Sequence, residues 1–255
     1  MIPSFRKLEK ALRLLGDGRF RPALLRGVAA TVEHMPAFDG HKFDAVVDIG
    51  ANRGQFALLM AGMFPDARIL AFEPLVEPFR KLLEITAHLP GVRAFNAAIG
   101  DTRGSMPMNV AKRDDSSSLL PITAMQERIF PDTGRARVDH VHVAPLGDFM
   151  NEFDLGRPSL LKIDVQGFEL EVLKGSADCL ERFDVVYVEA SFIQLYEGQP
   201  FASDIIDYLH HRDFRLSGIY NLSQTADGRA VQADFLFERR PGVVAKDVVQ
   251  LGEGS

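Results

Sequence analysis

Residues 46–55 read VVDIGANRGQ, and this stretch decides the fold. It begins inside an apolar run, Phe43–Ile49, which has the length and composition of a buried strand. Gly50 and Gly54 follow, where the missing Cβ lets the backbone turn tightly and approach a ligand. A helical stretch at 55–64 comes directly afterwards. A strand, a glycine turn and a helix in this order predict the first unit of a parallel α/β sheet.

The same alternation of strand and helix continues along most of the chain. The pattern predicts strands at 68–72, 92–99, 160–164 and 185–189, and helices at 76–88, 168–182 and 202–212. Two last strands, at 214–220 and 231–238, are joined by a linker too short for a crossover helix, which predicts an antiparallel pair. In the less regular middle, we expect a hairpin strand at 105–110, a helix at 122–129 and a strand at 137–143.

Charge, cysteine content and hydropathy argue against several classes of protein. The 255 residues carry a formal net charge of −6, which disfavours nucleic acid as a partner, because phosphate affinity rests on clustered Lys and Arg. The single cysteine, Cys179, excludes an intrachain disulfide and a multi-cysteine zinc site. No apolar run approaches the roughly 18 residues that span a bilayer, so we expect no transmembrane segment and a cytoplasmic protein.

Three segments are expected along the chain: an N-terminal helical cap at 1–40, the α/β domain at 41–240 and a flexible tail at 241–255. In the cap, Phe5, Leu8, Leu12 and Leu15 fall at helical spacing among basic residues. A basic amphipathic helix of this kind packs on its own domain, or lies on a membrane surface or an acidic partner. Packing on the domain is the favoured interpretation.

In an open parallel sheet, ligands bind beyond the carboxyl ends of the strands. The first predicted strand ends at Asp48 and Gly50. The second ends at Glu73, about 20 residues beyond the glycine turn, where a carboxylate can accept hydrogen bonds from both hydroxyls of a ribose. An acid as close to the turn as Asp48 repels a pyrophosphate and attracts a cation. The pattern therefore favours S-adenosylmethionine over NAD as the ligand.

Several stretches resemble one family. They are residues 46–55, 72–74 (FEP), 97–101 (AAIGD), 188–192 (VEASF), 195–198 (LYEG) and, most specifically, 161–175 (LKIDVQGFELEVLKG). Together they look like the FkbM-type methyltransferases, over about residues 43–238.

The resemblance implies a class I methyltransferase fold, which is Rossmann-like. Such a fold has a seven-stranded, mostly parallel sheet with the last strand antiparallel and helices on both faces. The resemblance also implies S-adenosylmethionine as the cofactor, and O-methylation of a hydroxyl on a sugar, glycan, polyketide or related metabolite. This chain departs from the family pattern at Gln166, where Glu is common, so we assign that position no acid–base role. It departs again at 145–148 (PLGD), where Thr-Leu-Asp is common.

The resemblance also implies roles for individual residues. Glu73 would bind the ribose hydroxyls, the turn at 98–101 would lie beside the adenine, and Asp164 would face the ammonium or the reacting centre. Each of Asp48 and Asp164 has an alternative role as the cap of the following helix. The expected cofactor-binding residues are Asp48, Gly50, Asn52, Gly54, Gln55, Glu73, Pro74, Ala98, Gly100, Asp101 and Asp164. Ser116, Ser117 and Ser118 are expected in a mobile loop over the acceptor.

An alcohol is a poor nucleophile, and a base within hydrogen-bond reach speeds its reaction by about 10²–10⁴-fold. Asp164 and Glu189 end neighbouring predicted strands and are the candidate catalytic residues. His140 and His142 share one face of a strand and are further candidates, but they have no evident third ligand, so no metal site is predicted.

Two other functions stay open at this point. One is a non-catalytic partner or scaffold that binds S-adenosylmethionine, because cofactor binding does not prove transfer. The other is an NAD-dependent oxidoreductase, which the missing third glycine and Asp48 disfavour.

Overall fold

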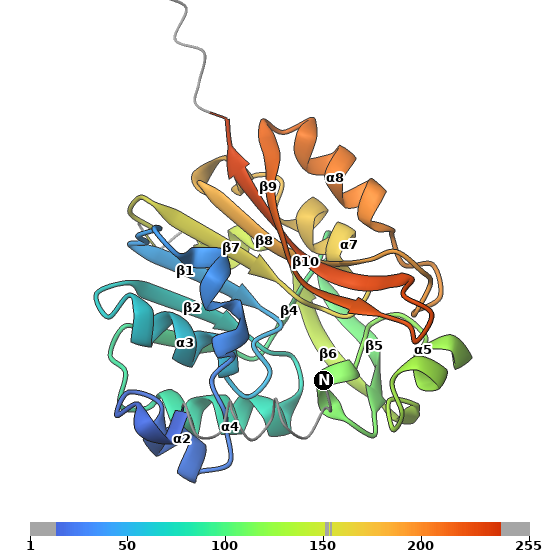
Figure 1. Cartoon of the computed structure of the whole chain (residues 1–255), viewed down its shortest axis with the longest axis horizontal. Coiled ribbons are helices and arrows are strands. Elements are labelled where there is room, and N and C mark those ends of the chain that lie inside the picture. The colour runs from blue at the N-terminus through green and yellow to red at the C-terminus, as the bar shows by residue number, and fades with distance from the viewer. Residues whose placement is uncertain (1–13, 151–152, 154, 241–255) are drawn as a thin grey trace, which may run out of the picture.

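The computed structural model describes residues 14–150, 153 and 155–240. Its main element is a seven-stranded sheet with the strand order β3-β2-β1-β7-β8-β10-β9 (Figure 1). Pairs between neighbours from β3 to β8 are parallel, whereas β10 is antiparallel to both β8 and β9. This confirms the predicted sheet with its antiparallel last strand. The strands are β1 (Ala45–Ile49), β2 (Arg68–Phe72), β3 (Val92–Phe95), β7 (Ser159–Ile163), β8 (Val185–Ser191), β9 (Phe214–Gln224) and β10 (Ala230–Arg239).

The order of the strands reverses beside β1. The chain runs from β1 to β2 and β3 on one side, and from β7 to β8 on the other. The carboxyl ends of β1 and β7 therefore lie next to each other at the topological switch point, where open α/β sheets bind ligands.

Helices cover both faces of the sheet, as predicted. Successive side chains of a strand point to opposite faces. In β1, Val47 and Ile49 pack in a core with α7 and α8, whereas Val46 packs in a second core with α3. The helices are α2 (Arg21–Leu25), α3 (Gln55–Met63), α4 (Val76–Thr86), α5 (Ala124–Ile129), α6 (Gly147–Met150), α7 (Glu169–Gly175) and α8 (Ala202–His210), with 3₁₀ turns η1 (Val32–Phe38), η2 (Asp114–Ser116) and η3 (Leu180–Arg182).

A second, three-stranded sheet, at the lower right of Figure 1, corrects two predictions. The predicted strand 92–99 is split, because the side chain of Asn96 donates hydrogen bonds of 2.9 Å to the main-chain oxygens of Glu73 and Pro74 and the chain then leaves the first sheet. The strand expected at 105–110 does not pair with the preceding strand, because β6 lies between them. The order is β4-β6-β5, with β4 (Ala98–Ile99), β5 (Gly104–Ala111) and β6 (Arg135–Ala144).

The long helix predicted at 168–182 is also wrong in extent, since α7 ends at Gly175. A Cβ at Gly175 would lie 2.2 Å from the main-chain oxygen of Gly100, so the end of α7 lies directly against the neighbouring turn. The main-chain oxygen of Gly175 accepts a hydrogen bond from the N–H of Leu146 at 2.9 Å. The rest of the predicted helix is an irregular segment with the short turn η3.

The N-terminal cap is described only in part. Phe5, Leu8 and Leu12 lie outside the described residues, as does the tail at 241–255. Leu15 is 43% exposed, whereas Leu14 is fully buried in the core that also holds α3. The predicted apolar face is therefore wrong at Leu15. In the part of the chain that the structure describes, no helix is both long and apolar enough to cross a membrane.

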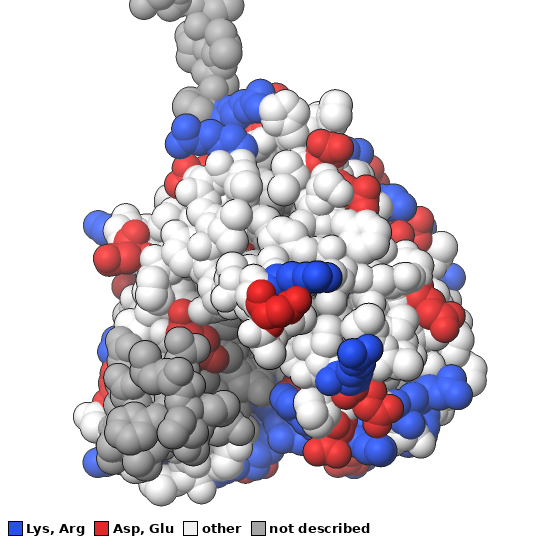
Figure 2. Space-filling view, turned by 45° about the vertical axis from the view of Figure 1, so that its right-hand side comes forward, with Lys and Arg blue, Asp and Glu red and all other residues white. Residues whose placement is uncertain are grey.

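Charged side chains lie mostly at the margins of the face shown in Figure 2. A broad uncharged area covers the upper middle of this face, and basic and acidic side chains lie next to each other near its centre and around its margins. On this face there is no wide patch of Lys and Arg alone.

Candidate active site

A cavity of about 240 Å³ lies at the carboxyl ends of β1, β2 and β7. Many of the residues assigned from the sequence line it: Gly50, Asn52, Gln55, Glu73, Pro74, Ala98, Ser117 and Asp164. The other assigned residues are not among its lining residues: Asp48, Gly54, Gly100, Asp101, Ser116, Ser118 and Glu189.

The glycine turn after β1 forms the floor of the cavity. Gly50 has a φ of +78°, and a Cβ there would lie 1.8 Å from the main-chain oxygen of Asp164. Only glycine therefore lets the ends of β1 and β7 come this close. Gly54 also has a positive φ, but a Cβ there would meet Leu82 of α4 at 2.7 Å. Its role in this structure is to let α3 start close to α4, and it lies away from the cavity.

Glu73 presents a nearly buried carboxylate to the cavity. Its Oε2 accepts the N–H of Asn52 at 2.9 Å, and its Oε1 accepts the N–H of Leu75 at 2.8 Å. Burial raises the pKa of Glu73 to about 7, although these two backbone hydrogen bonds oppose the shift. Each carboxylate oxygen can accept a further hydrogen bond, so this group can still receive two hydroxyls.

Part of the cavity wall is apolar, which was not predicted from the sequence. Phe72, which is fully buried in the core, lines the cavity together with Leu75, Ile99, Met108 and Leu119. Thr31 from the N-terminal cap also lines it. Such a wall suits a flat aromatic ring, with a few polar groups left to orient it.

Asp48 does not face the cavity, because it is buried in an ion pair with Lys162. The two residues lie opposite each other in the β1–β7 register, and Lys162 Nζ is 2.9 Å from Asp48 Oδ1. Burial raises the pKa of Asp48, against the attraction of Lys162. Burial alone would lower the pKa of Lys162, but Asp48 and Asp164 together raise it, so the ammonium stays charged. Lys162 was missed, although a lysine inside the apolar strand 160–163 was the available signal.

Asp164 reaches the cavity, with its side chain 36% exposed. Its Oδ1 accepts a hydrogen bond from Gln166 Nε2 at 2.7 Å, and the same nitrogen donates to Glu189 Oε2 at 2.9 Å. Tyr196 donates its hydroxyl proton towards Gln166 Oε1 at 3.0 Å. Because carboxylate oxygens only accept, these contacts determine which way the Gln166 amide points.

Glu189 lies behind Gln166 and away from the cavity. Its second oxygen, Oε1, accepts a hydrogen bond from Gln232 Nε2 at 2.7 Å. Burial first, and then the neighbouring charges of Asp164 and Asp234, raise the pKa of Glu189 well above its usual range. Of the two carboxylates expected at the reacting centre, Asp164 is therefore the one that a ligand in the cavity could touch.

Ser116, Ser117 and Ser118 do not form an open loop, because all three are buried. Ser117 Oγ accepts the N–H of Ala111 at 3.1 Å, and Ser118 pairs with Asn109 through two backbone hydrogen bonds. The expected mobile loop is thus a segment hydrogen-bonded to β5, and only Ser117 of the three lines the cavity.

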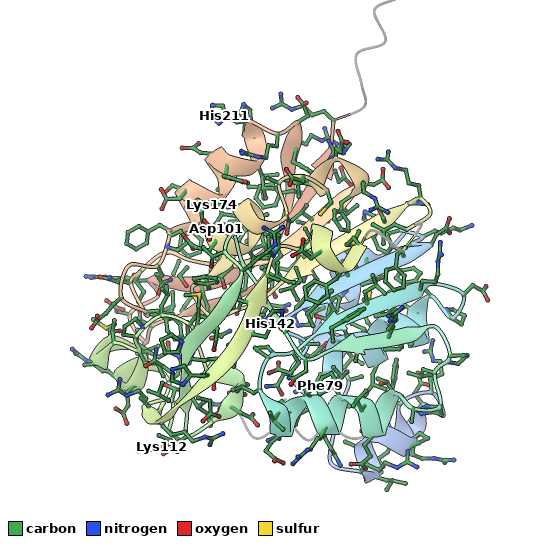
Figure 3. The ribbon with its side chains drawn as sticks, turned by 180° about the vertical axis from the view of Figure 1, so that it is seen from behind. Phe79, Asp101, Lys112, His142, Lys174 and His211 are labelled. Carbon is green, nitrogen blue, oxygen red and sulfur yellow. The ribbon has the colours of Figure 1, made fainter. Side chains whose placement is uncertain are left out.

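The turn after β4 and the two histidines lie elsewhere. Gly100 is buried near Phe168, whose ring a Cβ would meet at 3.2 Å, and Asp101 is exposed beside the end of α7. His140 and His142 are exposed on β6, and neither lines the cavity (Figure 3, where His142 is labelled). Within 14–150, 153 and 155–240, no group of three or more His, Cys, Asp or Glu residues could hold a metal ion.

Comparison with known proteins assigns the chain to a family. The model of the methyltransferase FkbM domain matches residues 48–216, which include the end of β1, the whole of β7 and most of the residues that line the cavity. The chain belongs to the FkbM methyltransferase family. This confirms the family predicted from the sequence and supports S-adenosylmethionine as the cofactor.

Curated relatives agree with this assignment. Methyltransferase sdnD of Sordaria araneosa is 31% identical over 155 residues, which are 51% of this chain and 59% of that protein. The 2-O-methyltransferase NoeI of Sinorhizobium fredii is 28% identical over 170 residues, which are 64% of this chain and 70% of that protein. The chain spans only about three fifths of the length of the first relatives that it matches.

Solved structures support the fold alone. The protein Sp1610 of Streptococcus pneumoniae, solved in complex with S-adenosyl-L-methionine, superposes with a TM-score of 0.50 at 10% identity. The match covers 84% of this chain and 73% of that one.

Proposed function

We propose that this chain is an S-adenosylmethionine-dependent O-methyltransferase whose cofactor binds in the cavity between β1, β2 and β7. The observation that carries the proposal is the buried carboxylate of Glu73, which faces the cavity beside the Gly50 turn. A carboxylate in this place has a use when the ligand brings hydroxyl donors, as a ribose does.

The residues around the cavity fit S-adenosylmethionine better than a dinucleotide. Among the described residues that line it there is no Lys or Arg, which a pyrophosphate would favour. Phe72, Leu75 and Ile99 offer an apolar surface for the adenine, and Glu73 offers two acceptor oxygens for the ribose. The negative charge of Asp164 at the cavity attracts the cationic part of the molecule.

When bound, S-adenosylmethionine supplies a methyl group on a positively charged sulfur. The chain then has to place an acceptor hydroxyl in line with that group and remove its proton. Asp164 is the proposed base: its carboxylate takes the hydroxyl proton as the acceptor oxygen gains the methyl group. Gln166 holds Oδ1 of this carboxylate, which leaves Oδ2 to meet the acceptor.

The proposed acceptor is a hydroxyl of a sugar, a glycan, a polyketide or a related metabolite. Asp114 and Asp115 line the same cavity, paired with Arg53 at 2.5 Å and with Arg113 at 2.8 Å. These carboxylates could accept hydrogen bonds from a polyhydroxylated molecule. The name of NoeI, a 2-O-methyltransferase, supports transfer to oxygen. That nucleic acid is no partner stays a prediction.

Titration calorimetry tests the cofactor, and labelled product tests the reaction. We expect S-adenosylmethionine and S-adenosylhomocysteine to bind and NAD not to bind. Incubation with methyl-labelled S-adenosylmethionine and extract fractions should give a labelled small molecule or glycan. Binding of NAD alone would overturn the proposal, and binding without any labelled product would favour the non-catalytic alternative.

A further inference from the structure

Lys162 connects the glycine turn of β1 to the end of β7, next to the proposed base. Its Nζ lies 2.9 Å from Asp48 Oδ1, 3.0 Å from the main-chain oxygen of Gly50 and 3.4 Å from that of Ile49. Nζ donates hydrogen bonds to these two main-chain oxygens, and its contact with Asp48 is an ion pair. The pair is shut off from water, with side-chain exposures of 7% for Lys162 and 0% for Asp48.

Asp164 is the next carboxylate within reach of Lys162. Its Oδ2 lies 3.9 Å from Nζ, which is too long for a hydrogen bond and about one ångström beyond the pair that Asp48 forms. In the described part of the chain, no donor is hydrogen-bonded to this oxygen, whereas Oδ1 is held by Gln166. Asp164 therefore keeps a free oxygen at the cavity only while Lys162 stays on β1.

We infer that Asp48 acts on the cofactor site through Lys162: it is a buried counter-ion that holds this lysine away from Asp164 and so leaves the Asp164 carboxylate free for the ligand. Both Asp48 and Lys162 are then positioning residues, and neither touches the ligand. This inference rests on the proposed function, because it takes the ligand to be S-adenosylmethionine.

The inference predicts a specific change in ligand preference. S-adenosylmethionine carries one positive charge more than S-adenosylhomocysteine, and otherwise differs from it by a single methyl group. In Asp48→Asn, Lys162 loses its counter-ion and turns to Asp164, so its ammonium neutralises the carboxylate that would otherwise be free at the cavity. Binding of the charged cofactor should then weaken roughly tenfold more than binding of the neutral product. The ratio of the two dissociation constants cancels any change in the turn that affects both ligands alike.

Titration calorimetry of the two ligands on the full chain is the test, with three variants. Asp48→Asn should lower the preference for S-adenosylmethionine roughly tenfold, and Asp48→Asn/Lys162→Met should restore it to within about threefold of the unchanged protein. Asp184→Asn is the matched control, because this aspartate lies at the opposite, amino end of β8, where it accepts the N–H of Ser159. It should leave the ratio unchanged.

An unchanged ratio in Asp48→Asn, or a double variant that keeps the lowered ratio, would overturn the inference. If Asp48→Asn does not fold, the double variant is compared with Asp164→Asn, which should lower the preference by itself. A double variant that also lowers it would then show that Asp48 acts directly. If the unchanged protein binds neither ligand, the proposed function fails. If the unchanged protein binds both ligands but the variants do not change the ratio as expected, only the inference on Asp48 and Lys162 fails.

Discussion

The affinity for the cofactor should depend on pH through Glu73. The pKa of its carboxyl is raised to about 7 because the group is buried, and its ionised form is the better acceptor for two ribose hydroxyls. If only the ionised form binds well, the dissociation constant grows up to tenfold per pH unit below that pKa. Between about pH 8.5 and about pH 5.5 the affinity should thus fall about 30-fold. S-adenosylhomocysteine is the best probe, because it lacks the sulfonium charge.

Titration calorimetry across this pH range measures the effect, and Glu73→Gln is the matched variant. The amide cannot ionise and offers one acceptor oxygen in place of two, so this variant should bind weakly at every pH and lose the slope. The same group makes a second, independent prediction for the ligand-free protein. Between its unfolded pKa near 4.5 and its folded pKa near 7, the folded state binds more protons than the unfolded state. Stability should therefore fall as pH rises through this window, by about 3 kcal/mol from Glu73. A flat binding curve for the unchanged protein, or a Glu73→Gln variant with normal affinity, would refute this reasoning.

Three further predictions test other parts of the site. Gly50→Ala should lower the melting temperature and abolish cofactor binding, because its Cβ would overlap the main-chain oxygen of Asp164. Gly27 also has a positive φ but lies in open space, so Gly27→Ala should lower the free energy of unfolding by only about 1 kcal/mol. Asp164→Asn should lower kcat by about 10²-fold or more with a smaller effect on folding, and normal turnover in this variant would show that Asp164 is not the base. Glu189→Gln should mainly lower the melting temperature, because its new N–H₂ group would face an N–H donor from Gln166 or Gln232. Turnover should survive exhaustive chelation, and a loss that a divalent ion restores would reveal a missed carboxylate site.

Much of the sheet could be predicted from the sequence, because it depends on local patterns. β2 begins and ends where the apolar run at 68–72 predicts, and α3 follows the glycine turn as expected. The errors fall where a distant partner decides the structure. The strand at 92–99 is interrupted because Asn96 bonds to the end of β2, and α7 stops because its last turn meets Gly100. Neither contact has a signature in the local sequence.

The same distinction explains which site residues were found. Gly50, Glu73 and Asp164 follow strand ends, and a strand end can be recognised from the sequence alone. Asp48 was found by the same signal, but its partner Lys162 was not. The two residues are far apart in the sequence, and their pairing can be predicted only when the register of β1 with β7 is known. The serines at 116–118 have the composition of a loop, yet Asn109 and Ala111 of β5 hold them in place.

The chemistry of the site follows from two properties of a sheet, its alternation and its register. Lys162 lies on β7 and Asp164 directly follows the end of that strand. The register places Asp48 beside Lys162 and Asp234 beside Glu189. Polar groups that four separate strands contribute thereby share one side of the sheet, where α3 and the N-terminal cap exclude water. Exclusion of water raises the pKa of Glu189. It also strengthens the attraction between the Lys162 ammonium and whichever carboxylate lies closest to it. A motif can locate Asp48, Asp164 and Glu189, but which carboxylate remains free for a ligand depends on how the strands are aligned.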